Sequence, residues 1–177
     1  ENQKEQEENS TWQIADNRNV GEMSAIAFYF ASRLSEKLHC IVGIIDCYWG
    51  GSSITCWMSR EQLAKLESGK HYLEKYAALV GEKSSQQYAK EMEEYNCAYQ
   101  HWLKSTEEVK QKDPQASWKE IHKICGECPW PQPVGWQSPF RPNGLHETMI
   151  RRIAPYSLRG FLYYQGEEDV QRYADYS

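Results

Sequence analysis

Two short polar blocks in the sequence hold residues of the kind that stabilise an alkoxide. Gly50 and Gly51 lie in one block and Gln165 opens the other, and each block follows an apolar run. Backbone N–H groups at a glycine turn and a side-chain amide are neutral, rigid donors, which is what an oxyanion hole for acyl transfer requires. We therefore expect an oxyanion hole built from Gly50 or Gly51 and Gln165. Glu167 would orient these donors, bind substrate hydroxyls or cap a following helix, and its spacing alone favours capping.

A nucleophile and a base are harder to find among these residues. Ser52 and Ser53 follow the glycine pair, but the nucleophile elbow G-x-S-x-G requires a glycine where Ile54 stands, so we interpret both serines as turn formers. His146, beside Glu147, is the one histidine placed where it would face a site. A packing or surface role is favoured even for His146, because no carboxylate is placed to orient its ring.

Metal ligands and reactive thiols are weakly supported. The acidic run at 167–169 offers oxygen ligands for Mg²⁺ or Ca²⁺, but no Asp-x-Asp pattern accompanies it, and a solvated helix start is the favoured interpretation. Cys125, Cys128 and His122 lack a second ligand pair for zinc. We expect no metal and no cofactor. The six irregularly spaced cysteines favour reduced thiols and lean toward the cytoplasm without determining the compartment.

The elements that must position these residues alternate between helix and strand patterns. An apolar stripe at spacings of three and four predicts a helix over 20–38, and the apolar run 41–46 predicts a strand buried on both faces. A second run, 158–164, predicts another such strand. Ligands bind at the carboxyl ends of parallel strands, so the fold class we predict is α/β, with the two polar blocks at one edge of a parallel sheet.

The segment from about 60 to 124 reads as a helical insertion. Three serines in or beside it are followed three residues later by Gln or Glu, the spacing of a capping box: Ser59, Ser84 and Ser117. Aromatic and Met residues recur in a four-three rhythm along the longest predicted helix: Tyr88, Met92, Tyr95, Tyr99 and Trp102. A seam of this kind stacks on a cofactor in some proteins, but packing against another element is the favoured interpretation.

Composition narrows the classes of partner. The 177 residues carry a formal net charge of -5, so no overall cationic field attracts nucleic acid or an anionic membrane surface. No apolar run approaches the ~20 residues that a membrane-spanning helix needs. We expect neither nucleic acid nor membrane as a partner, and the oligomeric state is not predicted.

Five stretches carry a family resemblance: Ser24-Ala25, Val-Gly-Ile-Ile at 42–45, Trp-Gly-Gly-Ser-Ser-Ile at 49–54 with Trp-Met-Ser at 57–59, the stretch 142–150, and the stretch 160–167, which contains Tyr-Tyr-Gln-Gly-Glu. The blocks at 49–57 and 164–167 are the most specific pair. Together these stretches resemble the sialate O-acetylesterase family of SGNH-hydrolase carbohydrate esterases. The resemblance covers most of the chain outside the helical segment. It implies a flavodoxin-like three-layer α/β/α fold with a parallel sheet, here partial, in one domain over 1–177 with the insertion at about 60–124.

The resemblance also implies a chemistry, a serine esterase that hydrolyses O-acetyl esters on sugars or glycans. Gly50, Gly51 and Gln165 match the oxyanion donors of the family, and Trp57, Glu167 and His146 are assigned to substrate binding. The family's Gly-Gln-Ser-Asn nucleophile segment and Asp-x-x-His segment do not occur in these 177 residues. We therefore expect an interior fragment that is inactive alone, with a full-length parent that is a carboxylic ester hydrolase. His146 and Glu147 depart from the aromatic-Asn pair usual in the family.

Two alternatives stay open. The first keeps the mechanism and replaces the sialic acid substrate by acetylated xylan, since no residue discriminates between the sugars. The second is a noncatalytic carbohydrate-binding or interaction module in which tryptophans stack on sugar rings, namely Trp49, Trp57, Trp130 and Trp136.

Overall fold

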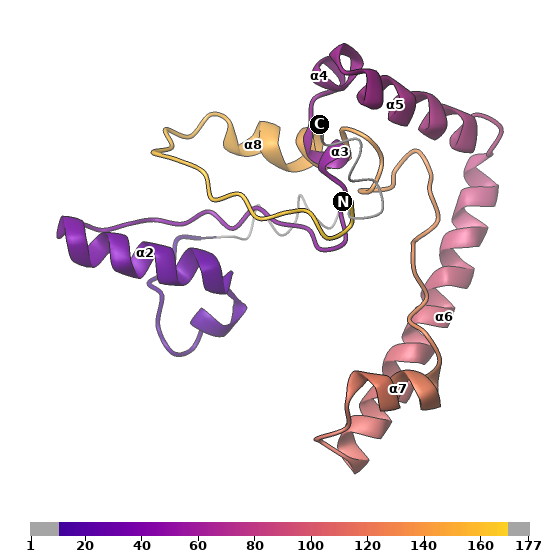
Figure 1. The fold of residues 1–177 in the computed structure, drawn as a ribbon, viewed down its shortest axis with the longest axis horizontal. Helices are drawn as coiled ribbons and strands as arrows, with labels where there is room; N and C mark the ends of the chain where they lie inside the picture. Colours follow the sequence, from indigo (N-terminus) through magenta and orange to yellow (C-terminus); the bar gives the residue numbers. More distant parts are fainter. Residues whose placement is uncertain (1–10, 170–177) are drawn as a thin grey trace. The chain divides into compact units, whose positions relative to one another are not determined.

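The computed structural model describes residues 11–169, which form helices, turns and irregular segments (Figure 1). In chain order the elements are η1 (Val20–Glu22), α2 (Ala25–Leu38), α3 (Ile54–Trp57), α4 (Arg60–Lys65), α5 (Glu67–Val80), α6 (Ser85–Lys112), α7 (Trp118–Cys125), η2 (His146–Ile150) and α8 (Arg151–Ile153). The chain divides into two compact units. Within the described residues, one unit takes 11–49 with Gly160–Tyr163, and the other takes Gly50–Arg159 with 164–169.

The predicted α/β fold is wrong. Within 11–169 there is no strand, and so no parallel sheet and no flavodoxin-like three-layer α/β/α arrangement; the described fold is all-helical. Segments 41–46 and 158–164 run as irregular chain; Ile41 is 99% exposed and Phe161 is 76% exposed, whereas Val42, Ile44 and Ile45 are half-buried. A strand exists only where its backbone pairs with a neighbouring backbone, and an apolar run cannot supply that partner.

Helix α2 is the main element of the first unit. Its N-cap is Ser24, whose Oγ accepts a hydrogen bond from the backbone N–H of Ala27 at 3.4 Å. The backbone N–H of Ser24 donates to Oδ2 of Asp46 at 3.2 Å, which ties the helix start to the irregular segment after the helix. The predicted helix is confirmed from Ala25 to Leu38, whereas Val20–Glu22 is a separate 3-10 turn. The predicted apolar face is not fully covered, because Phe30 is 47% exposed.

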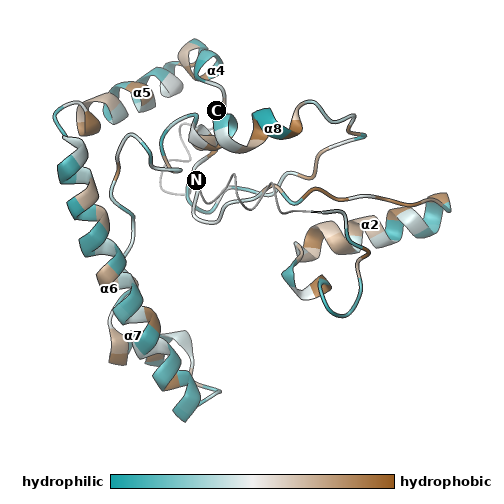
Figure 2. Cartoon of the chain, turned by 180° about the vertical axis from the view of Figure 1, so that it is seen from behind, coloured by the Kyte–Doolittle hydropathy of each residue, from teal (hydrophilic) through white to brown (hydrophobic). Residues whose placement is uncertain are grey.

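Four helices, α4 to α7, occupy the segment predicted to be helical. Ser84 with Gln87, at the start of α6, forms the reciprocal capping box that its spacing predicts, and Ser117 with Glu120 does the same for α7. Ser59 caps α4 through one bond, from the backbone N–H of Gln62 at 3.2 Å. Helices α4 and α5 pack together, and α6 packs on α7. Most of α6 is hydrophilic in Figure 2, as expected for a helix that buries only a narrow seam.

That seam packs on protein, as predicted. Tyr95, Tyr99 and Trp102 stack along α6, with ring centroids 5.9 and 6.3 Å apart, and Trp118 of α7 stacks on Trp102 at 6.4 Å. The indole N–H of Trp102 donates to the backbone oxygen of Gly126 at 3.0 Å and closes the end of α7. Aromatic packing thus holds this helix pair together. In the part of the chain described, no helix has both the length and the apolar character to cross a bilayer.

Candidate functional site

The glycine turn leads into the short helix α3, and its conformation requires glycine at one position. Gly51 has φ +66°, the left-handed region that favours glycine. A Cβ placed on Gly51 would lie 2.7 Å from Cζ2 of Trp130, so the indole ring packs directly on the backbone. Trp130 in turn meets Phe140 edge to face at 5.2 Å. Gly50 is exposed, and a Cβ there would meet no atom within 4 Å.

Gln165 lies against this turn although 113 residues separate it from Ser52. Its side-chain nitrogen Nε2 donates to the backbone oxygen of Ser52 at 3.3 Å and to Oδ2 of Asp169 at 2.6 Å. The side chain is half-buried. The structure therefore places the predicted amide donor one residue from Gly51, and does so without the sheet edge that the sequence predicts.

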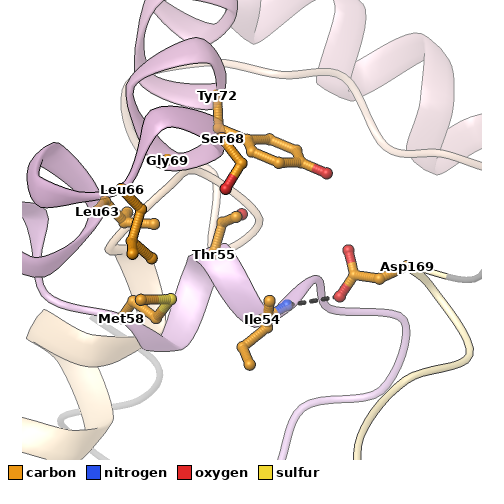
Figure 3. Close-up of a pocket in the computed structure, with 9 residues that line it drawn as sticks. All are labelled: Ile54, Thr55, Met58, Leu63, Leu66, Ser68, Gly69, Tyr72 and Asp169. Carbon is orange, nitrogen blue, oxygen red and sulfur yellow. Dashed lines mark hydrogen bonds between the residues drawn. The ribbon is translucent and has the colours of Figure 1, made fainter. Parts of the chain in front are cut away.

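Asp169 is the residue that sequence reasoning missed. Its side chain is 1% exposed, and Oδ2 also accepts the backbone N–H of Ile54 at 2.8 Å, at the start of α3 (Figure 3). The interpretation of 167–169 as a solvated helix start is wrong for Asp169, whereas Glu167 and Glu168 are exposed. An acidic run does not reveal which of its carboxylates is buried. The one available signal was the spacing of four residues from Gln165.

A pocket of about 220 Å³ opens beside α3, α4 and the start of α5, with Asp169 among its lining residues (Figure 3). The lining is mainly apolar, with hydroxyl groups and one carboxylate: Ile54, Thr55, Met58, Leu63, Leu66, Ser68, Gly69, Tyr72 and Asp169. Asp169 thus lines the pocket and contacts Gln165. The helical segment contributes walls to a cavity at the candidate site.

The two serines after the glycines serve the local fold. Oγ of Ser53 accepts the backbone N–H of Thr55 at 3.2 Å and caps α3, and Oγ of Ser52 accepts the indole N–H of Trp57 at 2.8 Å. Both serines are buried. These contacts agree with the interpretation of both serines as turn formers. The polar edge of Trp57 is directed at Ser52, so only the carbon surface of its ring is left for a substrate.

His146 begins η2, which packs on α3. The backbone N–H of Asn143 donates to the backbone oxygen of Thr55 at 2.8 Å and holds the preceding loop against the same helix. Nδ1 of His146 is buried and has no hydrogen-bond partner within residues 11–169. The structure therefore brings His146 toward α3 without joining that nitrogen to the glycines or to Gln165.

Cys56, on α3, is also close to the site, but its chemistry is that of a packing residue. The side chain is fully buried, and Sγ donates to the backbone oxygen of Phe140 at 3.3 Å. Burial, with a smaller contribution from the nearby charge of Asp169, raises the pKa of Cys56 to about 11. The thiol is protonated at neutral pH and is a poor nucleophile.

No metal ligand set is evident in the described region. All six cysteines are free thiols, and His122 contacts Glu127 at 3.4 Å beside Cys125 and Cys128. Across residues 11–169, no three His, Cys, Asp or Glu side chains group in a way that would hold a metal ion.

Comparisons with protein-family models, with curated proteins and with solved structures find no match to this chain.

Proposed function

We propose that this chain supplies the oxyanion-stabilising part of a serine-type carbohydrate O-acetylesterase. In that reaction a serine hydroxyl attacks the acetyl carbonyl carbon, and the carbonyl oxygen becomes an alkoxide. A backbone N–H of Gly50 or Gly51 and the side-chain amide of Gln165 would donate to that oxygen. The serine and its His–Asp base would come from residues outside this sequence, because neither family motif occurs in it.

The observation that supports the proposal is the position of the Gln165 amide at the glycine turn. Two chain segments that are far apart in sequence, both glycine-containing, meet there through the bond from Nε2 of Gln165 to the backbone oxygen of Ser52. Neutral donors that are held in place before the reaction stabilise a developing charge without having to reorganise. A half-buried amide beside a left-handed glycine is an arrangement of this kind.

The substrate class we propose is an O-acetylated sugar or glycan, with an acetylated sialic acid placed first and acetylated xylan second. Trp57, Glu167 and His146 remain the proposed substrate contacts. Glu167 is exposed and free to meet a sugar hydroxyl, and Trp57 has its ring carbons to offer. The pocket beside Asp169 is a candidate space for the sugar.

The test is acetate release from both substrates by a longer protein that contains this sequence. Replacing one oxyanion donor typically lowers kcat by about 10²-fold or more, so Gln165→Ala should do the same. Gln111→Ala, at an exposed position of α6, is the matched control and should leave kcat unchanged. The 177-residue chain alone should release no acetate. Equal kcat for Gln165→Ala and the parent would remove Gln165 from the reaction.

A noncatalytic carbohydrate-binding module is the second candidate, and exposed indole rings favour it. Trp130 is 44% exposed and Trp136 is 52% exposed, and such rings stack on sugars. Saturable binding of an unacetylated glycan, combined with no acetate release by the longer protein, would favour this candidate over the esterase.

A further inference from the structure

The carboxylate of Asp169 joins the two segments of the candidate site. Its Oδ2 accepts the amide N–H of Gln165 at 2.6 Å and the backbone N–H of Ile54 at 2.8 Å, and its side chain is 1% exposed. We propose that Asp169 is a positioning residue that holds the Gln165 amide with an N–H directed at the glycine turn. This inference rests on the function proposed above for Gln165. It names the residue that orients the Gln165 amide so that its N–H groups face the glycine turn.

The first step of the argument concerns which end of the amide faces the turn. Oδ2 of Asp169 accepts the backbone N–H of Ile54, so this oxygen faces Gln165 as an acceptor and the nitrogen of the Gln165 amide must face it. The backbone oxygen of Ser52 favours the same orientation, but through a longer bond of 3.3 Å, so loss of the Asp169 acceptor would weaken the resistance to a 180° rotation that presents the amide oxygen instead. That oxygen would repel an alkoxide. Asp169 therefore provides the shorter of the two bonds that hold the orientation in which Gln165 can stabilise negative charge.

The second step concerns how the amide protons are shared. A primary amide nitrogen carries two N–H groups, and here Nε2 donates to Asp169 at 2.6 Å and to the backbone oxygen of Ser52 at 3.3 Å. The bond to Asp169 is the shorter of the two and is therefore the stronger. An alkoxide would accept more strongly than the neutral Ser52 oxygen. It would thus take over the second N–H while Asp169 keeps the first.

The third step separates orientation from charge. A negative charge at this position would oppose a nearby alkoxide, so the benefit of Asp169 lies in its acceptor atom. In Asp169→Asn, the side-chain oxygen would stay where Oδ2 is, because the N–H of Ile54 still requires an acceptor there. Asparagine should therefore rescue the function that alanine removes.

The kinetic test measures kcat and KM for acetate release in the longer protein. Asp169→Ala should lower kcat about 10- to 100-fold, the scale of a misplaced catalytic group, while KM changes less than about threefold. Asp169→Asn should stay within about fivefold of the parent. In a Gln165→Ala background, Asp169→Ala should change kcat less than about twofold, because the group that Asp169 positions is already gone. A full effect of Asp169→Ala in that background, or an increase in kcat, would overturn the proposal.

Asp169→Ala also removes a hydrogen bond at the start of α3, so a control must weaken this helix start without changing Asp169 or Gln165. Ser53→Ala is that control, because it removes the bond from the backbone N–H of Thr55 to the Ser53 side chain. This variant should retain the parent kcat. If Ser53→Ala lowers kcat as much as Asp169→Ala does, the effect is one of helix stability and the proposal is wrong.

A second readout does not depend on activity. In this 177-residue chain, the two side-chain amide protons of Gln165 should have widely separated NMR shifts, assigned by their loss in Gln165→Ala. Asp169→Ala should bring the two shifts together, and Asp169→Asn should largely preserve the separation. Unchanged shifts in Asp169→Ala refute the positioning role. Absence of acetate release by the parent, with the shift change present, instead refutes only the proposed esterase function.

Discussion

Gly51→Ala tests whether the glycine turn has the conformation described. An alanine at φ +66° would cost about 1–2 kcal/mol, because its Cβ crowds the following carbonyl oxygen. The new Cβ would also lie 2.7 Å from Cζ2 of Trp130, far inside the usual 3.5–4.0 Å carbon contact, and overpacking of this kind costs about 1–3 kcal/mol. Alanine also lowers the conformational entropy of the unfolded chain, which offsets about 0.4–1 kcal/mol of this destabilisation. The expected net destabilisation is about 1–5 kcal/mol.

Gly50→Ala is the matched control, since a Cβ on Gly50 meets nothing within 4 Å and its φ is not positive. Its stability should change by no more than about 1 kcal/mol, toward stabilisation. The assay is urea unfolding of both variants, followed by circular dichroism at 222 nm. If the two free energies of unfolding differ by less than about 0.5 kcal/mol, both the left-handed turn and the contact of Gly51 with Trp130 are absent, and the site geometry is wrong.

Three further predictions concern two other buried positions in the same unit, Cys56 and Gly135. Burial raises the pKa of Cys56 from about 9 to about 11, so its stabilising contribution is complete below pH 9 and is lost as the pH rises toward 11. At about 1.4 kcal/mol per pKa unit this amounts to about 3 kcal/mol, and Cys56→Ala should lose less stability than the parent between pH 9 and 11. Iodoacetamide at pH 8 should alkylate the exposed Cys97 and spare Cys56; equal labelling of both would contradict the burial. Gly135→Ala should release its loop from α6, because a Cβ there would lie 2.2 Å from the Tyr88 ring, and hydrogen exchange should rise in the loop and not in α7.

Local features of this fold could be predicted because their interactions lie within a few residues. The capping boxes of Ser84 and Ser117 connect positions three apart, and the structure confirms both. The aromatic seam of α6 follows from helical periodicity, which fixes the face but not the partner. The stacking of this seam on Trp118 could not be predicted, because it depends on how α6 and α7 pack against each other.

The predicted strands fail for the corresponding reason. The run 41–46 has the composition of a buried strand, but a strand requires a second backbone beside it, and within 11–169 no segment pairs with it. The same limit explains the missed carboxylate. The acidic run at 167–169 is uniform as a pattern, and only the packing of Asp169 on the start of α3 distinguishes one member from the others.

From the sequence alone, the helices between 60 and 124, the role of Ser52 and Ser53 in the turn and the candidate status of Gly51 and Gln165 could be determined. These features depend on residue type and on spacings of a few residues, and both can be read directly from the sequence. The tertiary structure decided that the two polar blocks meet, that no sheet brings them together within the described residues, and that Asp169 is the buried group between them. Contacts across more than a hundred residues depend on which surfaces pack in space, and no local pattern encodes that choice.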